Sequence, residues 1–166
     1  MSRFHRLCHL KFRSKLNVGQ YVEAGKTIIG FVGTTGKSTG PHVHHDGTLG
    51  KPKSWHQYRN RPLSEYFDTV RWQGIVMPYA NRYLTSFHAQ KSHIGIDINV
   101  RPVDDGLPIY SPVNGRVVYI EPPMTIYRII SGIRRLIQPT WGQGFGNFIV
   151  IEEDMARPTI VDGKKL

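Results

Sequence analysis

Three histidines stand within four positions, behind a run of small, turn-forming residues, in the stretch TGKSTGPHVHHDG. Histidine is the commonest metal ligand, and its side chain exchanges a proton near neutral pH. Alternate side chains of a strand point to the same face, so His42 and His44 should share one face and His45 should lie on the other. Two neighbouring imidazoles suit a metal ligand with a catalytic neighbour. The alternative is a polar loop that happens to be rich in histidine.

A second group that could bind a metal lies in the stretch SHIGIDI, where His93 and Asp97 are four positions apart. On a straight strand this spacing separates them by roughly 13 Å, so both can bind one ion only if the backbone turns or bulges between them. Gly95 would permit such a bulge. A hydrolytic zinc site uses three protein ligands and keeps one position open for water. HxxxD together with HxH therefore indicates a zinc site.

The elements that must position these residues are predicted to be strands. Two strand-rich blocks, one from residue 4 to 45 and one starting near Ile75, flank a polar middle rich in turn formers and aromatic residues. The stretches HRLCHLKF, HIGIDINV and GFGNFIVIEED read as strands. GLPIYSPVNGRVVYI predicts two more strands across a turn at Asn114–Gly115, the favoured dipeptide of a tight hairpin. The fold class predicted from these patterns is mostly β.

One stretch, TIYRIISGIRRLIQ, does not show the alternation typical of a strand. Its apolar residues recur at helical spacing from Ile126 to Ile137, and arginines occupy the other positions. This pattern predicts a basic amphipathic helix. Packing of the helix against the sheet is preferred to a position on an anionic membrane surface.

Length and composition bound the classes of protein. The 166 residues suffice for one domain with a real core, and 39% hydrophobic and 20% charged residues are typical of a globular chain. The net charge of +10 favours a polyanionic partner, either nucleic acid or an anionic cell envelope. Cys8 is the single cysteine, which excludes an intrachain disulfide. No segment is long and apolar enough to span a bilayer, and the N-terminal stretch lacks the apolar region of a signal peptide.

Three stretches resemble one known family: SHIGIDI, VGQYVEAGKTIIGFVGTTGKSTGPHVH and SPVNGRVVYI…GFGNFIVIEE. They look like the lysostaphin-type (LytM-like) zinc endopeptidases, which cut peptide bonds in bacterial peptidoglycan. The motifs of that family are HxxxD, a His-Leu pair on a later strand, and HxH behind a glycine-rich turn, and all three occur here. The similarity covers most of residues 4–66 and 77–153. It implies an antiparallel sheet of the barrel-sandwich-hybrid type, with the isoleucine-rich helix as an insertion.

The resemblance also assigns roles by position. His44, His93 and Asp97 would bind Zn²⁺, whereas His42 and His9 would be catalytic histidines that do not bind the metal. Which of the two takes the proton and which stabilises the oxyanion stays open. The histidines left over are predicted to be surface or groove residues rather than ligands: His5, His56 and His88.

The order of the motifs departs from the family. There HxxxD comes first and HxH last, whereas here the family's C-terminal half (1–67) precedes its N-terminal half (75–166), with 68–74 joining them. We interpret the chain as a circular permutant, which predicts that the strand at 4–10 lies beside the strand at 148–152. The rival is that two half-domains from neighbouring chains or a tandem array complete each other's site. Smaller departures concern substrate positioning rather than zinc ligands: His45, Asp46 and Cys8.

The resemblance implies a peptidoglycan hydrolase that acts on a short wall peptide. A chain of charge +10 would be attracted to an anionic cell wall. The lack of a signal peptide favours a phage lysin, either released through a membrane lesion or carried in a virion or tail assembly. The alternative is a non-catalytic LytM-like binding or structural module, for example in a phage particle. A specific nucleic-acid binder would rest on charge alone, because no binding motif is present.

Overall fold

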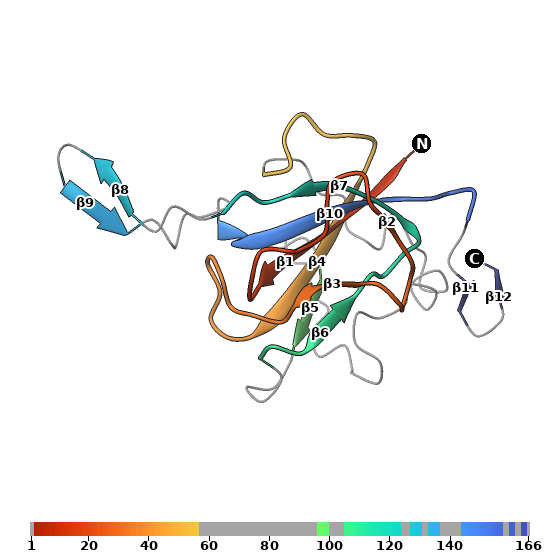
Figure 1. Cartoon of the computed structure of the whole chain (residues 1–166), viewed down its shortest axis with the longest axis horizontal. Coiled ribbons are helices and arrows are strands. Elements are labelled where there is room, and N and C mark those ends of the chain that lie inside the picture. Colours follow the sequence, from red (N-terminus) through yellow and green to blue (C-terminus); the bar gives the residue numbers. More distant parts are fainter. Residues whose placement is uncertain are drawn as a thin grey trace.

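The computed structural model describes residues 2–56, 96–99, 105–123, 127–130, 133–136, 144–157, 160–161 and 164–165. The helices and strands assigned in these ranges are all strands, which confirms a mostly β, antiparallel fold (Figure 1). The predicted linker at 68–74, His88 and His93 lie outside the described residues. Within the described part of the chain no helix is long and apolar enough to cross a membrane.

The main element is a six-stranded antiparallel sheet in the order β2-β7-β10-β1-β4-β5. Its strands are β2 (Tyr21–Val22), β7 (Gly115–Ile120), β10 (Asn147–Glu153), β1 (Arg3–Leu10), β4 (His42–Leu49) and β5 (Ile96–Asn99). The first strand of the chain is therefore central, with β10 on one side and β4 on the other (Figure 1). Phe4 pairs with Glu152 and Leu10 with Asn147, so the predicted pairing of these two strands is confirmed.

Three further strand pairs lie outside this sheet. β3 (Ile28–Phe31) pairs with β6 (Pro108–Tyr110), β8 (Tyr127–Ile130) with β9 (Ile133–Leu136), and β11 (Ile160–Val161) with β12 (Lys164–Lys165).

The tight hairpin predicted at Asn114–Gly115 is wrong, although both strands exist. β6 pairs with β3 rather than with β7, because the segment between them is tied elsewhere. The Ser111 amide donates to the Thr27 carbonyl at 2.9 Å. The side-chain oxygen of Asn114 accepts a hydrogen bond from the Ala24 amide at 2.9 Å. The backbone carbonyl of Asn114 accepts one from the Asp154 amide. The Asn-Gly pair thus joins loops instead of closing a two-residue turn.

The predicted amphipathic helix at 126–137 is also wrong. Its described residues form the antiparallel strands β8 and β9, with Tyr127 opposite Leu136 and Ile130 opposite Ile133. The apolar spacing of a short segment fits a helix by chance, whereas the abundance of isoleucine favours a strand, because β-branched side chains restrict χ1. Ser131 and Gly132, a turn-forming pair in sequence, stand between the two strands.

Alternation along the strands gives the six-stranded sheet two different faces. One face carries the larger core, which packs β3 and β6 against the sheet and includes Leu7, Val43, Ile98, Ile149 and Ile151. The other face carries a smaller aromatic cluster around Phe4, Cys8, Phe148 and Val150, with Trp55 packed against it. The even-numbered residues of β4 lie on this second face, where the sequence predicts the site.

Candidate active site

The predicted HxH pair lies on β4, next to the predicted aspartate on β5. His44 is directly opposite Asp97, and its Nδ1 lies 3.0 Å from Asp97 Oδ1. His42 is on the same face, with Nε2 3.7 Å from the same oxygen. His45 points into the opposite face, as alternation requires. One sheet therefore brings together three of the five predicted site residues.

His9 reaches this group through a β-bulge. The register of β1 with β10 shifts between Leu7 and Leu10, and His9 has a φ of 62°, a left-handed conformation that is uncommon outside glycine. The bulge places the ring of His9 with its centroid 4.7 Å from that of His42 and 6.2 Å from that of His44. A straight strand would have sent this side chain into the opposite face. The fourth predicted residue thus joins the site.

The bulge is held by two loops that approach it closely, one before β4 and one before β10. The His9 amide donates to the Phe145 carbonyl at 3.0 Å, and His9 Nδ1 donates to the Thr35 carbonyl at 2.8 Å. A side chain at Gly33 would collide with the backbone of Lys11, and one at Gly146 (φ 64°) with the backbone of Thr35. Glycine at these two positions lets three backbone segments meet around His9.

Backbone carbonyls also fix the tautomers of both candidate catalytic histidines. His42 Nδ1 lies 2.8 Å from the Gly40 carbonyl and 3.2 Å from Ser38 Oγ. Because a carbonyl can only accept, Nδ1 carries the proton in His42, as it does in His9. In the neutral ring, Nε2 is then the nitrogen with a lone pair. Both imidazoles are therefore arranged to accept or deliver a proton at Nε2.

His9 and His44 differ in charge. Burial lowers the pKa of His9 to about 4, despite the hydrogen bond to the Thr35 carbonyl, so His9 is neutral at pH 7. Burial also opposes a charge on His44, but hydrogen bonds to Asp46 and Asp97 outweigh it and raise the pKa of His44 to about 9. Without a metal, His44 is a cation between two carboxylates.

Behind His44 lies a buried ion pair, Arg6–Asp46, that was not predicted from the sequence. Arg6 donates to Asp46 through Nε at 3.0 Å and Nη2 at 2.5 Å, and both side chains are 1% exposed. Asp46 Oδ2 also lies 3.2 Å from His44 Nε2. Burial would raise the pKa of Asp46, yet Arg6 and then His44 hold it well below its usual range. The signal in the sequence was the position of Asp46, two residues after His44 and so on the same face.

The donor set fits zinc in part. Two ligand atoms of a tetrahedral zinc at about 2.0–2.1 Å lie roughly 3.3 Å apart, close to the separation of His44 Nδ1 and Asp97 Oδ1. One imidazole and one carboxylate are also usual zinc ligands. Among the described residues no three His, Cys, Asp or Glu side chains form a group that could hold a metal ion. The third predicted ligand, His93, lies outside those residues, so its position stays a prediction.

Two other histidines were predicted to be at the surface or in a groove. For His5 the prediction is wrong: it is buried, with Nδ1 3.1 Å from His45 Nε2 and Nε2 3.4 Å from Glu153 Oε2. Both histidines are 1% exposed, so this pair belongs to the packed interior. Burial, and then His5, lower the pKa of His45 to about 3. His56 is half-buried and hydrogen-bonded to Glu121 at 2.8 Å.

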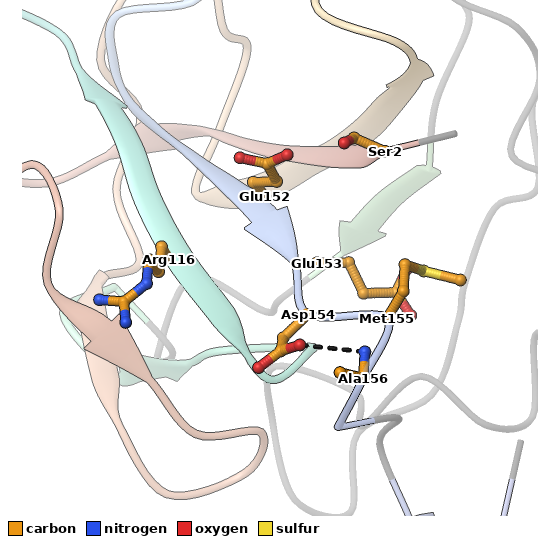
Figure 2. A pocket seen from close by; sticks show the side chains of 7 residues that line it. All are labelled: Ser2, Arg116, Glu152, Glu153, Asp154, Met155 and Ala156. Carbon is orange, nitrogen blue, oxygen red and sulfur yellow. Dashed lines mark hydrogen bonds between the residues drawn. The ribbon is translucent and has the colours of Figure 1, made fainter.

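A separate pocket lies at the end of β10 and contains none of the five predicted residues. Figure 2 shows its lining, which includes three consecutive acidic residues and Arg116, and the Ala156 amide donates to Asp154 at 3.0 Å. The residues that line it are Ser2, Arg116, Glu152, Glu153, Asp154, Met155 and Ala156. The catalytic chemistry predicted from the sequence therefore does not belong to this pocket.

Comparison of the chain with protein-family models, with curated proteins and with solved structures gives no match.

Proposed function

We propose that this chain is a zinc-dependent endopeptidase that hydrolyses peptide bonds in bacterial peptidoglycan, as a circularly permuted member of the lysostaphin type. One observation carries the proposal. Four of the five predicted residues, including His9 and Asp97 at opposite ends of the motif order, come from three separate strands and meet on one face of one sheet. The motif resemblance, and not any match to a known protein, supplies the substrate class.

In this proposal His44, Asp97 and His93 hold the zinc ion. Zinc in a three-ligand site supplies Lewis acidity, which activates a water and polarises the scissile carbonyl. His9 lies beside His44 and His42 beside Asp97, each with its Nδ1 proton fixed by a backbone carbonyl. One Nε2 can take the proton of the attacking water, and the other, when protonated, can donate to the developing oxyanion.

The test combines metal content with cell-wall hydrolysis. Purified protein should contain about one zinc per chain, as one three-ligand site requires, and should reduce the turbidity of a cell-wall suspension. His44→Ala, His93→Ala and Asp97→Ala should each lose both properties. His9→Ala and His42→Ala should keep zinc and lose hydrolysis by roughly 10²–10⁴-fold, the usual contribution of a positioned acid or base.

His88→Ala serves as the matched control, because His88 lies outside the motifs, and it should behave like the parent chain. Zinc-free parent protein would refute the metal site. Zinc-loaded protein without hydrolysis of any wall would favour the non-catalytic LytM-like module. If His9→Ala or His42→Ala hydrolyses cell walls at near the parent rate, the role proposed for that histidine is wrong.

A further inference from the structure

The Arg6–Asp46 pair stands out among the buried groups because it is charged, almost fully enclosed and in contact with a proposed zinc ligand. The sheet register explains the contact. Arg6 is directly opposite Asp46 on β4, and Asp46 is two residues beyond His44 on the same face. Arg6–Asp46 and His44–Asp97 are thus two successive cross-strand pairs on one face, and the Asp46–His44 contact joins them into one continuous series over three neighbouring strands.

Each ring nitrogen of His44 faces a different carboxylate. Nδ1 faces Asp97, whose side chain is 26% exposed, whereas Nε2 faces Asp46, whose side chain is 1% exposed. Both oxygens of Asp46 already accept from Arg6. Asp46 is thus enclosed and held by the guanidinium, with lone pairs left to accept from His44 Nε2, while Asp97 is the carboxylate that solvent can reach. The two sides of the imidazole are not equivalent.

Arg6 is itself fixed on three sides. Nη1 donates to the Trp55 carbonyl at 2.7 Å, and the guanidinium lies 3.7 Å from the centroid of the Phe145 ring. A planar, bidentate donor held in this way leaves Asp46 little freedom to turn. The order of contacts runs from Trp55 through Arg6 and Asp46 to His44.

We infer that the buried Arg6–Asp46 pair is a positioning pair for His44, which keeps the proton on Nε2 and leaves Nδ1, beside Asp97, as the nitrogen that binds zinc. The inference rests on the proposed zinc site. A ligating histidine whose other ring nitrogen donates to a carboxylate has its orientation and tautomer set by that carboxylate, and loss of such a partner typically costs 10–100-fold in metal affinity.

The first measurement uses the parent protein. ¹⁵N NMR of the zinc-loaded chain should show His44 with the metal on Nδ1 and a proton on Nε2. A metal on Nε2 would overturn the inference, because that nitrogen would then not be donating to Asp46. This measurement does not depend on the folding of any variant.

The second measurement is zinc affinity, by competition with a chromophoric chelator. Asp46→Asn, which keeps the size but not the charge, should bind zinc about 10–100-fold more weakly. The double variant Arg6→Met/Asp46→Leu removes both charges, and apolar replacement of a buried pair commonly preserves folding. It should fold, as judged by circular dichroism, and should show a similar loss of affinity. If Asp46→Asn does not fold, the zinc affinity of the double variant alone tests the positioning role.

Glu153→Gln is the matched control. It removes a largely buried carboxylate that also contacts a histidine of β1, but on the other face of the sheet, and should leave zinc affinity unchanged. Zinc binding by the parent with equal binding by both Asp46 variants would overturn the positioning role alone. Absence of zinc from the parent would overturn the proposed function and this inference with it.

Discussion

Hydrogen bonds to backbone carbonyls and carboxylates decide which ring nitrogen of each site histidine carries a proton. His9 and His42 donate from Nδ1 to carbonyls, whereas His44 meets a carboxylate at each nitrogen. In the proposed site, the first two would transfer a proton at Nε2 and the third would bind the metal. Identical side chains would then acquire different roles from their partners, and the partners come from distant parts of the chain.

The Glu153 carboxylate gives a pH prediction at the residue scale. Burial would raise its pKa, but His5 and Arg3 outweigh burial and lower it. The stabilisation is therefore present above the unfolded pKa, near 4.3–4.5, and is lost as the pH falls through the lower folded pKa. Glu153→Gln should lower the free energy of unfolding by about 1 kcal/mol at pH 7, as for one net hydrogen bond, and by less at pH 3.

Urea unfolding from pH 3 to pH 7 measures this difference. Glu23→Gln is the control, because Glu23 forms an exposed pair with Lys26 that should contribute almost nothing. A difference between parent and Glu153→Gln that stays constant over the whole pH range would show that ionisation of this carboxylate does not stabilise the fold.

At the scale of elements, the loop before β4 positions His9 through Thr35. Its hydroxyl donates to the Leu10 carbonyl at 2.8 Å and accepts from the Asn147 amide at 3.0 Å, while its carbonyl accepts from His9. One residue thus joins the bulge of β1 to the start of β10. The arrangement explains how an uncommon backbone conformation at His9 is maintained.

Thr35→Val should therefore weaken both stability and catalysis. The variant keeps the shape but leaves the Leu10 carbonyl and the Asn147 amide without this partner, at a cost of about 1–3 kcal/mol. Hydrolysis should fall while zinc content stays at the parent level, because no proposed ligand is touched. Thr35→Ser, which retains the hydroxyl, is the control and should be close to the parent in both unfolding and turbidity assays. Equal behaviour of the two variants would show that the hydroxyl does not hold His9.

Comparison of the predicted with the observed elements shows which features of the fold a sequence pattern can predict. Alternation predicted β1, β4 and β10, and it put His42 and His44 on one face, because period-two burial is a local property of a strand. It could not predict the bulge at His9, which depends on a contact with Thr35 in a loop 26 residues away. The same limit explains the wrong hairpin and the wrong helix, since the partners of a strand are set by tertiary contacts. The ion pair of Arg6 with Asp46 was not predicted at all, because the two residues are 40 positions apart.

At the scale of the molecule, the described strands join both ends of the motif order in one sheet. β1 lies between β10 and β4, and β5 completes the edge beside β4. The end of β10 at Glu153 is next to the start of β1 at Arg3, as antiparallel pairing requires. A short connection from the end of β10 to the start of β1 would give the family's usual motif order. This closeness of the two ends is what the proposed permutation requires. The linker at 68–74 would then have to join the old termini.

The last prediction tests whether one chain completes the site. Residues 67–74 span at most roughly 26 Å when extended, so the old termini cannot be further apart if the chain is a permutant. A chain that supplies His44 and Asp97 to the same site cannot be rescued by a partner with a different defect. A mixture of His44→Ala and Asp97→Ala chains should therefore show no cell-wall hydrolysis above that of each variant alone.

Under the rival arrangement, His9, His42 and His44 would come from one chain and His93 and Asp97 from another. Mixing the two variants would then create some sites with every residue intact, and the activity of the parent would fall on dilution as the chains separate. The His44→Ala variant mixed with His42→Ala is the control, because both defects lie in the same half and neither arrangement can rescue them. Recovery of hydrolysis in the first mixture but not in the control would contradict the permuted single chain; the direct pairing of His44 with Asp97 across β4 and β5 leads us to expect none.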